Sequence, residues 1–216
     1  MKLWSDSFKD GDAIPAEFAF GAIDPDQHVT LSANKNPHLA WSDWPAGTKS
    51  LALICHDPDV PSRGDDVNQE GKTVSADLPR VDFYHWALID IQPLSNSIEV
   101  GEFSSGVTAR GKSGPDIIGS PIPDARHGKN DYTGWFAGDP DMAGNYFGYD
   151  GPCPPWNDSI RHRYVFTIYA LDVARLPVEG DFTAAEARAA LDGHVLAQAQ
   201  LTGIYTLNPE LAPAGA

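Results

Sequence analysis

Three segments of the chain carry the hydrophobic patterns of β-strands. Residues 49–60 (KSLALICHDPDV) stay mostly apolar on both faces up to their end, as expected of a buried strand. Residues 81–91 (VDFYHWALIDI) and 161–173 (RHRYVFTIYALDV) combine apolar, aromatic and β-branched side chains in a similar way. Each segment begins or ends in polar side chains that could take part in chemistry.

Because side chains alternate between the two faces of a strand, the pattern also predicts which residues share a face. These sets are Leu51, Leu53, Cys55 and Asp57 on the first segment, Phe83, His85, Ala87 and Ile89 on the second, and His162, Tyr164, Phe166 and Ile168 on the third. Each set therefore carries a titratable side chain toward a strand end.

The C-terminal part of the chain has the signals of a helix and a last strand. Thr183 and Glu186 form a capping-box pattern for a helix over residues 183–192, and Gly193 would end it. One or two further helical turns and a strand near 199–207 (AQLTGIYTL) are expected to follow.

The remaining segments are rich in turn residues. Residues 1–48 predict a layer of short strands and turns, and residues 101–160 predict a long irregular connection whose many aromatic side chains argue against disorder. The 20 glycines and 18 prolines favour many short elements joined by turns over a helical bundle. We expect one mostly β domain over residues 1–216, since no repeat or low-complexity linker divides the chain.

The charge balance excludes some classes of partner. Lysine and arginine number 15 against 30 acidic residues, and the formal net charge of -15 repels nucleic acids and anionic membrane surfaces. A local cluster of donors can still bind a small anion, because at short range it outweighs the screened global charge. The N-terminus lacks the apolar core of a signal peptide, and no apolar run is long enough for a transmembrane segment. We therefore expect a soluble, cytoplasmic protein.

The polar residues at the predicted strand ends each have an ordinary structural interpretation. Asp57 and Asp59 could cap a turn stiffened by prolines, and His85 could be a core imidazole with one backbone partner. His162 and Tyr164 could be strand residues at the rim of a sheet. Their joint placement on strand ends, with the rigid run GPCPP just ahead of the third strand, indicates a binding pocket instead.

The chemistry of such a pocket would suit an anion. A carboxylate next to an imidazole orients the ring and favours its protonated form, so Asp57 beside His85 or His162 would make a cationic donor. Tyr164, two residues from His162 on the same strand face, would add a hydroxyl.

Five motifs, in this order, resemble a known family. The motifs are DPDVP (57–61), YHW (84–86), GKNDYTG (128–134), GYDGPCPP (148–155) and RHRYVFTIYALD (161–172). Together they resemble the phosphatidylethanolamine-binding protein family, in particular its bacterial Raf-kinase-inhibitor-like members, from about residue 50 to residue 206. The resemblance implies a mostly β single domain in which a large antiparallel sheet packs with a smaller second sheet, with few short helices near the C-terminus.

The resemblance also implies a function. It implies a non-catalytic protein, with no cofactor or metal, that binds a small anion such as phosphate, a phospholipid head group or a carboxylate, and that regulates a partner kinase or protease. The residues implied to form its ligand pocket are Asp57, Asp59, His85, Gly151, Pro152, Pro154, Pro155, His162 and Tyr164.

Two segments, at about 62–82 and 133–147, lengthen the chain relative to the shorter bacterial pattern. Both flank the implied pocket, where long surface insertions cost little stability. One of them could act as a lid, supply Arg63 or Trp135 to a ligand, or form a homodimer contact.

Other classes of function stay open on the sequence alone. Two histidines and a carboxylate could form a metal triad in a metal-dependent hydrolase or lyase, although no H-x-H or H-E-x-x-H spacing is present. A serine hydrolase is disfavoured because no G-x-S-x-G motif occurs. A third class is a protein that inhibits a kinase or protease by surface contact alone.

Cys55 and Cys153 could approach each other, but two free thiols are the favoured interpretation in a reducing compartment.

Overall fold

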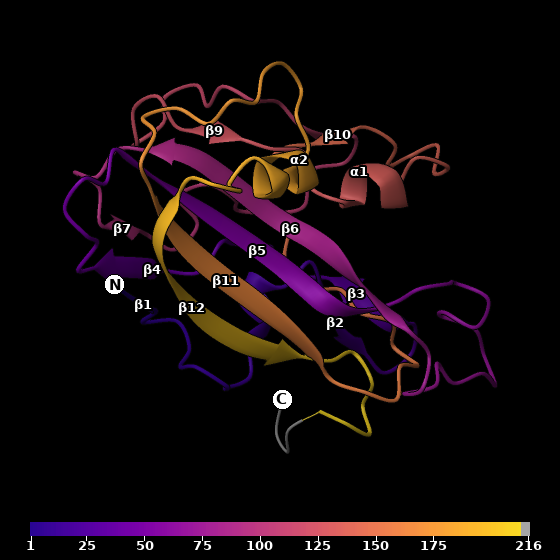
Figure 1. Ribbon diagram of the computed structural model, residues 1–216. Helices are drawn as coiled ribbons and strands as arrows, with labels where there is room; N and C mark the ends of the chain where they lie inside the picture. Colours follow the sequence, from indigo (N-terminus) through magenta and orange to yellow (C-terminus); the bar gives the residue numbers. More distant parts are fainter. Residues whose placement is uncertain (213–216) are drawn as a thin grey trace.

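The structure, a computed structural model, describes residues 1–212. Its elements in chain order (Figure 1) are β1 (Lys2–Trp4), the 3-10 helix η1 (Ala16–Phe18), β2 (Gly21–Asp24), β3 (His28–Leu31), β4 (Leu39–Ser42), β5 (Ser50–Pro61), β6 (Arg80–Ile91), β7 (Ser97–Ile98), β8 (Gly111–Lys112), β9 (Arg126–His127), α1 (Tyr132–Trp135), β10 (Asn145–Tyr146), β11 (His162–Leu171), α2 (Ala184–Ala189) and β12 (Val195–Tyr205). Within the described residues, no helix has the length and apolar character needed to cross a membrane.

The three segments with the strongest strand patterns become the centre of one large sheet. They are β5, β6 and β11, and the five-stranded order β12-β11-β5-β6-β9 is antiparallel throughout. Figure 1 shows these long strands running side by side across the molecule. The predicted strands are thus confirmed, because runs of apolar and β-branched residues at this spacing favour a central, buried strand.

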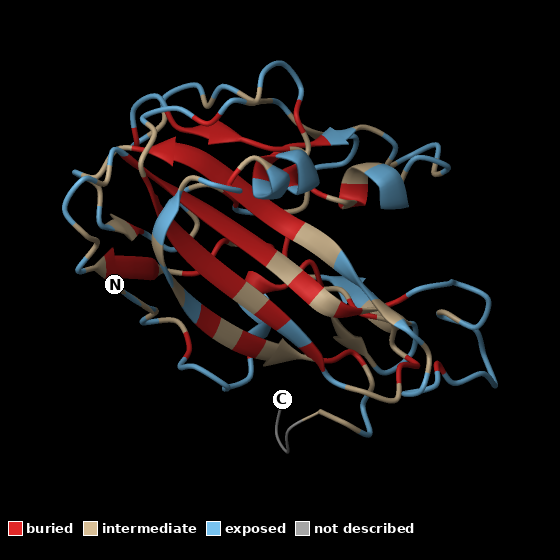
Figure 2. Cartoon of the chain, viewed as in Figure 1, coloured by how far each residue is buried: buried red, intermediate tan, exposed pale blue. Residues whose placement is uncertain are grey.

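Both faces of the large sheet are covered. On one face, Leu53 and Phe166 belong to a core cluster with Leu39 and Trp41 of the smaller antiparallel sheet β1-β4-β7. On the other face, side chains of β5, β6 and β11 pack with α2. Figure 2 shows the middle of the large sheet as buried. The predicted mostly β fold, with a large antiparallel sheet and a smaller second sheet, is confirmed.

The helix α2 begins where the capping box predicts. Oγ1 of Thr183 accepts a hydrogen bond of 3.1 Å from the backbone N–H of Glu186, whose side chain accepts one of 2.7 Å from the N–H of Thr183. The helix is shorter than predicted, since turns occupy the residues that follow it up to Gly193. The further helical turns are wrong, because β12 already starts at Val195, which pairs with Leu171 of β11.

One prediction of side-chain direction on β6 is wrong, and a β-bulge is the reason. Cys55 pairs with Trp86, but the next residue of β5, His56, pairs with Tyr84, so His85 is an extra residue on β6. Ala87 and Ile89 pack on the face that carries α2, as strict alternation requires. The ring of His85 instead contacts the ring of Tyr164 on the opposite face, with centroids 5.1 Å apart.

Candidate ligand-binding site

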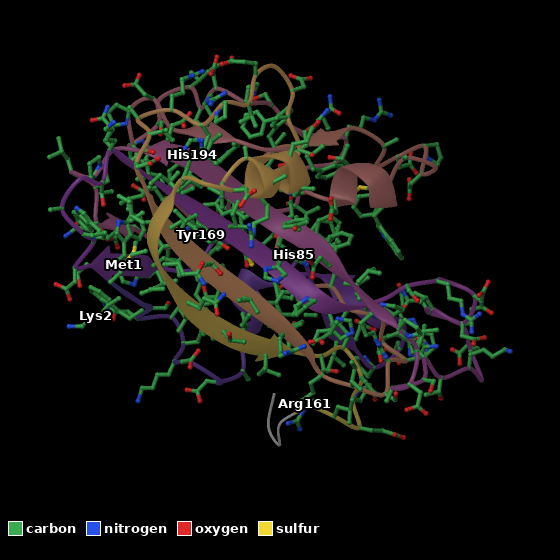
Figure 3. The ribbon with its side chains drawn as sticks, viewed as in Figure 1. Met1, Lys2, His85, Arg161, Tyr169 and His194 are labelled. Carbon is green, nitrogen blue, oxygen red and sulfur yellow. The ribbon has the colours of Figure 1, made fainter. Side chains whose placement is uncertain are left out.

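A cavity of about 660 Å³ lies where β5 ends and where β6 and β11 begin. We name it the Asp57 cavity. The predicted site residues that line it are Asp57, His85, Pro154, Pro155 and Tyr164, and those that do not are Asp59, Gly151, Pro152 and His162. Figure 3 shows the side chain of His85 projecting from β6 near the middle of the large sheet.

His162 is fully buried behind the cavity and joins two carboxylates. Its Nδ1 lies 2.7 Å from Oδ2 of Asp57, and its Nε2 lies 3.0 Å from Oδ2 of Asp158. Burial opposes a charge on this ring, but the bonds with Asp158 and Asp57 outweigh it and raise the pKa of His162 to about 9. Both nitrogens therefore donate to carboxylates at neutral pH. The cation that Asp57 orients is His162, which neutralises the carboxylates from behind the cavity wall.

A second charged group extends this network. The guanidinium of Arg80 donates to both carboxylate oxygens of Asp158, at 2.6 and 3.0 Å, and to the carbonyl oxygen of Asp59 at 2.9 Å. Because Asp57, His162, Asp158 and Arg80 alternate in sign, the row of charges sums to zero. The floor of the cavity is therefore close to electrically neutral.

Asp59 forms a separate ion pair at the surface end of β11. Its carboxylate accepts bonds from the backbone N–H and from the guanidinium of Arg163, at 2.7 to 2.9 Å. Burial raises the pKa of Asp59, but these bonds outweigh burial and hold its pKa below the usual value. Asp59 thus fixes β5 against β11, and its oxygens are not turned toward the cavity.

His85 is held by a backbone carbonyl group. Its Nδ1 lies 2.7 Å from the carbonyl oxygen of Asp150, so this nitrogen carries the proton and donates it. Burial lowers the pKa of His85, which keeps the ring neutral at pH 7. Its Nε2 is then an acceptor, and it has no hydrogen-bond partner among the protein groups that the structure describes.

The residue that holds His85 is itself fixed by three side chains. The carboxylate of Asp150 accepts bonds from Asn34 at 2.7 Å and Asn130 at 2.8 Å, and it lies 3.0 Å from Nζ of Lys112. Asp150 is completely buried, so its charge depends on these partners. The network makes the orientation of His85 a rigid feature of the site.

Tyr164 supplies a hydrogen-bond donor to the lining of the cavity. Its hydroxyl is buried and makes no hydrogen bond with the groups of residues 1–212, although the carboxylate of Asp57 lies close enough to influence it. Burial, and then the nearby charge of Asp57, raise the pKa of Tyr164 well above its ordinary value, so the group stays protonated. A protonated phenol without an acceptor is a hydrogen-bond donor that a ligand can satisfy.

The GPCPP run forms a rigid wall, but only its second half reaches the cavity. A Cβ atom at Gly151 would lie 2.1 Å from the carbonyl oxygen of Phe18, so the backbone approach requires glycine. The carbonyl oxygen of Pro152 accepts bonds from the N–H groups of Phe20 and Gly21. Gly151 and Pro152 therefore anchor the wall.

The two cysteines are separate free thiols, as the favoured interpretation predicts. Cys55 is buried in the core of the large sheet, whereas Cys153 lines the cavity next to the proline residues. Burial raises the pKa of Cys153 to about 12. Cys153 is therefore a neutral thiol at physiological pH, and it adds an apolar contact rather than a nucleophile.

Both inserted segments contribute to the cavity. The first supplies Ser62, Arg63, Gly64, Val67 and Asn68, and the second supplies Trp135, Phe136 and Met142. Asn157 anchors the first segment, because its Nδ2 donates to the carbonyl oxygens of Asp66, Gln69 and Lys72 at 2.8, 3.3 and 3.1 Å. Of the roles considered for the insertions, the position of Arg63 and Trp135 agrees with supplying side chains to a ligand.

Sequence reasoning missed most of the apolar lining. Phe20, Leu31, Val60, Phe83 and Tyr132 line the cavity together with the residues of the insertions. A signal was present in the segment DYTGWF, where aromatic residues recur three and four positions after Tyr132, at the spacing that places them on one side of a helical turn. Phe20 and Leu31 carried no such signal, because their position depends on contacts with distant segments.

The geometry gives no support to the metal-dependent alternative. In the described part of the chain, no group of three histidine, cysteine or acidic side chains is arranged to hold a metal ion. Both nitrogens of His162, which a triad with His85 and Asp57 would need, already bind carboxylates.

Known proteins resemble the chain over nearly its whole length. A family model described as phosphatidylethanolamine-binding protein matches residues 4–206. The UPF0098 protein YbhB of Escherichia coli is 30% identical over 95% of this chain and 100% of its own length, and a UPF0098 protein of Methanothermobacter thermautotrophicus is 31% identical over 95% and 98%.

Solved structures share the fold. The crystal structure of Escherichia coli YbcL, described as a new member of the mammalian PEBP family, matches with a TM-score of 0.66, 24% identity and coverage of 95% of this chain and 97% of that one. A PEBP homologue from Chlamydia trachomatis, CT736, matches with a TM-score of 0.60, 28% identity and coverage of 94% and 95%. The family match includes the N-terminal residues, where the motifs gave no signal, and the chain belongs to the phosphatidylethanolamine-binding protein family.

Proposed function

We propose that this chain is a non-catalytic binding protein whose Asp57 cavity takes a small oxyanion: phosphate, a phospholipid head group or a carboxylate. The observation that carries the proposal is the buried hydroxyl of Tyr164, a residue of the cavity lining, which makes no hydrogen bond with the described protein groups. A buried donor without a partner costs free energy until an acceptor reaches it. An oxyanion supplies that acceptor.

The neighbouring Nε2 of His85 makes the binding of an anion depend on a proton. Because the free ring is neutral, Nε2 presents a lone pair, which an anion meets favourably only if His85 gains a proton or the ligand brings its own O–H group. The charge of Asp57 does not repel the anion, since His162 already neutralises that charge. Arg63 adds a positive charge to the lining.

The same residues support binding without catalysis. Cys153 is the thiol of the cavity, and its pKa of about 12 keeps it from acting as a nucleophile at neutral pH. The imidazole of His85 lies beside Tyr164, but the high pKa of that phenol makes it a donor and not an activated nucleophile.

Isothermal titration calorimetry with inorganic phosphate, phosphoethanolamine and acetate tests this function. We expect binding to the wild-type protein, and a loss of roughly ten-fold or more in affinity in Tyr164→Phe and in His85→Gln, because each removes a hydrogen bond to a charged group. Tyr84→Phe is the matched control, since Tyr84 packs on the opposite face of the sheet. Equal affinities in all four proteins, or no binding to the wild-type protein, would contradict the proposal.

We further propose that the protein regulates a partner kinase or protease, as its resemblance to Raf-kinase-inhibitor-like proteins implies. Membership of the family supports this step. A pull-down from a lysate should recover one partner with the wild-type protein and lose it with Tyr164→Phe, if occupation of the cavity controls the contact. A cytoplasmic location and a homodimer stay predictions from the sequence.

A further inference from the structure

The Asp57 cavity is much larger than an inorganic anion. Its volume of about 660 Å³ falls within the range of roughly 300–1,000 Å³ that is typical of pockets for drug-sized organic ligands. The polar groups that could hold an anion, Tyr164 and His85, lie next to each other. Most of the cavity is therefore left for another part of the ligand.

An aromatic wall fills the space beside the polar groups. The rings of Phe20 and Tyr132 stack with centroids 4.7 Å apart at 15°, and those of Tyr132 and Phe136 stack 5.6 Å apart at 18°. The ring of His85 meets Tyr132 edge-on at 5.6 Å, so the wall begins at the polar groups. The hydroxyl of Tyr132 donates to the carbonyl oxygen of Gly151 at 2.7 Å, which fixes this ring in place. Aromatic faces and edges in such a rigid wall favour contact with another ring.

Large apolar side chains also stand exposed at the edge of the cavity. Trp135 is 58% exposed and Leu31 is 62% exposed, and both belong to the lining. Exposed tryptophan and leucine side chains next to a cavity gain free energy when a ligand removes them from water. Trp135 and Leu31 therefore offer exposed apolar surface to a ligand in the cavity.

The cavity offers little to a ligand with a positive charge. Among the described residues of the lining, Asp57 is the carboxylate, and its two oxygens already accept bonds from His162 and from the backbone N–H of Asp59. A primary ammonium group would thus meet a carboxylate whose charge His162 already balances, which gives little return for the loss of its water.

Resting on the proposed function, we propose that the Asp57 cavity selects an amphiphilic organic anion with an aromatic body. Its phosphate or carboxylate group contacts Tyr164 and His85, and its ring packs on the wall of Phe20, Tyr132 and Phe136 and against Trp135. The ligand class is an aryl phosphate or aryl carboxylate, and Trp135 is a specificity-determining residue.

Titration calorimetry with three phosphate monoesters tests the proposal: methyl phosphate, phosphoethanolamine and phenyl phosphate. We expect phenyl phosphate to bind the wild-type protein at least about ten-fold more tightly than methyl phosphate, because the ring leaves water for an apolar wall. In Trp135→Ala the ratio of the affinity for phenyl phosphate to that for methyl phosphate should fall by roughly half or more, with the affinity for methyl phosphate unchanged. Trp4→Ala is the matched control, since Trp4 lies on β1, is 42% exposed and does not line the cavity.

The outcomes separate this proposal from the proposed function. Equal affinities for methyl and phenyl phosphate, both weakened by Tyr164→Phe, overturn the aromatic body and support the anion site. A preference for phenyl phosphate that Trp135→Ala leaves intact, or phosphoethanolamine binding as tightly as phenyl phosphate, also overturns the proposal. Binding of phenyl phosphate that weakens in Trp135→Ala but not in Tyr164→Phe or His85→Gln supports the aromatic body and overturns the anion site.

Discussion

Nδ1 of His162 lies 2.7 Å from Oδ2 of Asp57, and the two residues are 105 positions apart in the chain. The contact joins the start of β11 to the end of β5 behind the cavity. It places a protonated imidazole where it balances the carboxylate without touching a ligand. The acidic corner of the site is thereby made compatible with an anion.

Stability should depend on the proton of His162. Its pKa of about 9 in the folded protein lies above the value of about 6.5 expected in the unfolded chain. The stabilisation is therefore complete below about pH 6.5, and it is lost as the pH rises through about 9. Urea unfolding of the wild-type protein at pH 6, 8 and 10 should show that the free energy of unfolding falls by on the order of 3 kcal/mol between pH 6 and pH 10.

Replacing His162 should remove this dependence. In His162→Gln, Asp57 and Asp158 face each other without the imidazolium between them. We expect the free energy of unfolding to fall by about 3–5 kcal/mol at pH 6. The decline between pH 6 and 10 should shrink in this variant but persist in His194→Gln, a control whose partner Asp172 has a half-exposed side chain. An unchanged decline in His162→Gln would show that another group titrates.

Binding of an anion should be accompanied by uptake of a proton. The pKa of His85 is lowered by burial, so the ring is neutral in the free protein at pH 7, and an anion at Nε2 raises that pKa. Affinity for acetate should therefore fall as the pH rises from 6 to 8. Calorimetry in two buffers with different ionisation enthalpies measures the uptake directly. Proton uptake that is equally large in His85→Gln would assign the proton to a different group.

Asn157 should hold the first inserted segment over the cavity. Besides its three bonds to carbonyl oxygens, its Oδ1 accepts a bond of 2.9 Å from the N–H of Asn68. Asn157→Ala should lower the free energy of unfolding by about 1–3 kcal/mol and speed proteolysis within residues 62–79. Limited proteolysis with mass spectrometry locates the cleavage. Asn96→Ala, at an exposed position, serves as the control, and equal cleavage in both variants would refute the anchoring role.

Gly151 should not tolerate a larger side chain. A methyl group there would meet the carbonyl oxygen of Phe18, and this backbone cannot move without disturbing the wall. Gly151→Ala should lower stability by about 1–3 kcal/mol or more, as seen for overpacked interiors. Thermal unfolding compares it with Gly138→Ala, where a Cβ meets no atom within 4 Å. Similar midpoints for the two variants would contradict the close approach.

Local features of the fold could be predicted from the sequence. The patterns of β5, β6 and β11 located the centre of the large sheet, and Thr183 with Glu186 located the start of α2. Such features depend on residues that are neighbours along the chain, so their spacing carries the information. The motifs also identified the family, and five of the nine residues implied for the pocket line the cavity.

The direction of side chains at the site depended on tertiary contacts. A bulge in the pairing of β5 with β6 turns His85 away from the face of Ala87, and no alternation pattern contains that step. The role of His162 depends on Asp158, which took no part in the predicted site. The sequence by itself determined the three central strands, the helix start and the family. Only the tertiary structure decided which polar atoms are paired and which are free, because pairing joins residues that the chain separates by many positions.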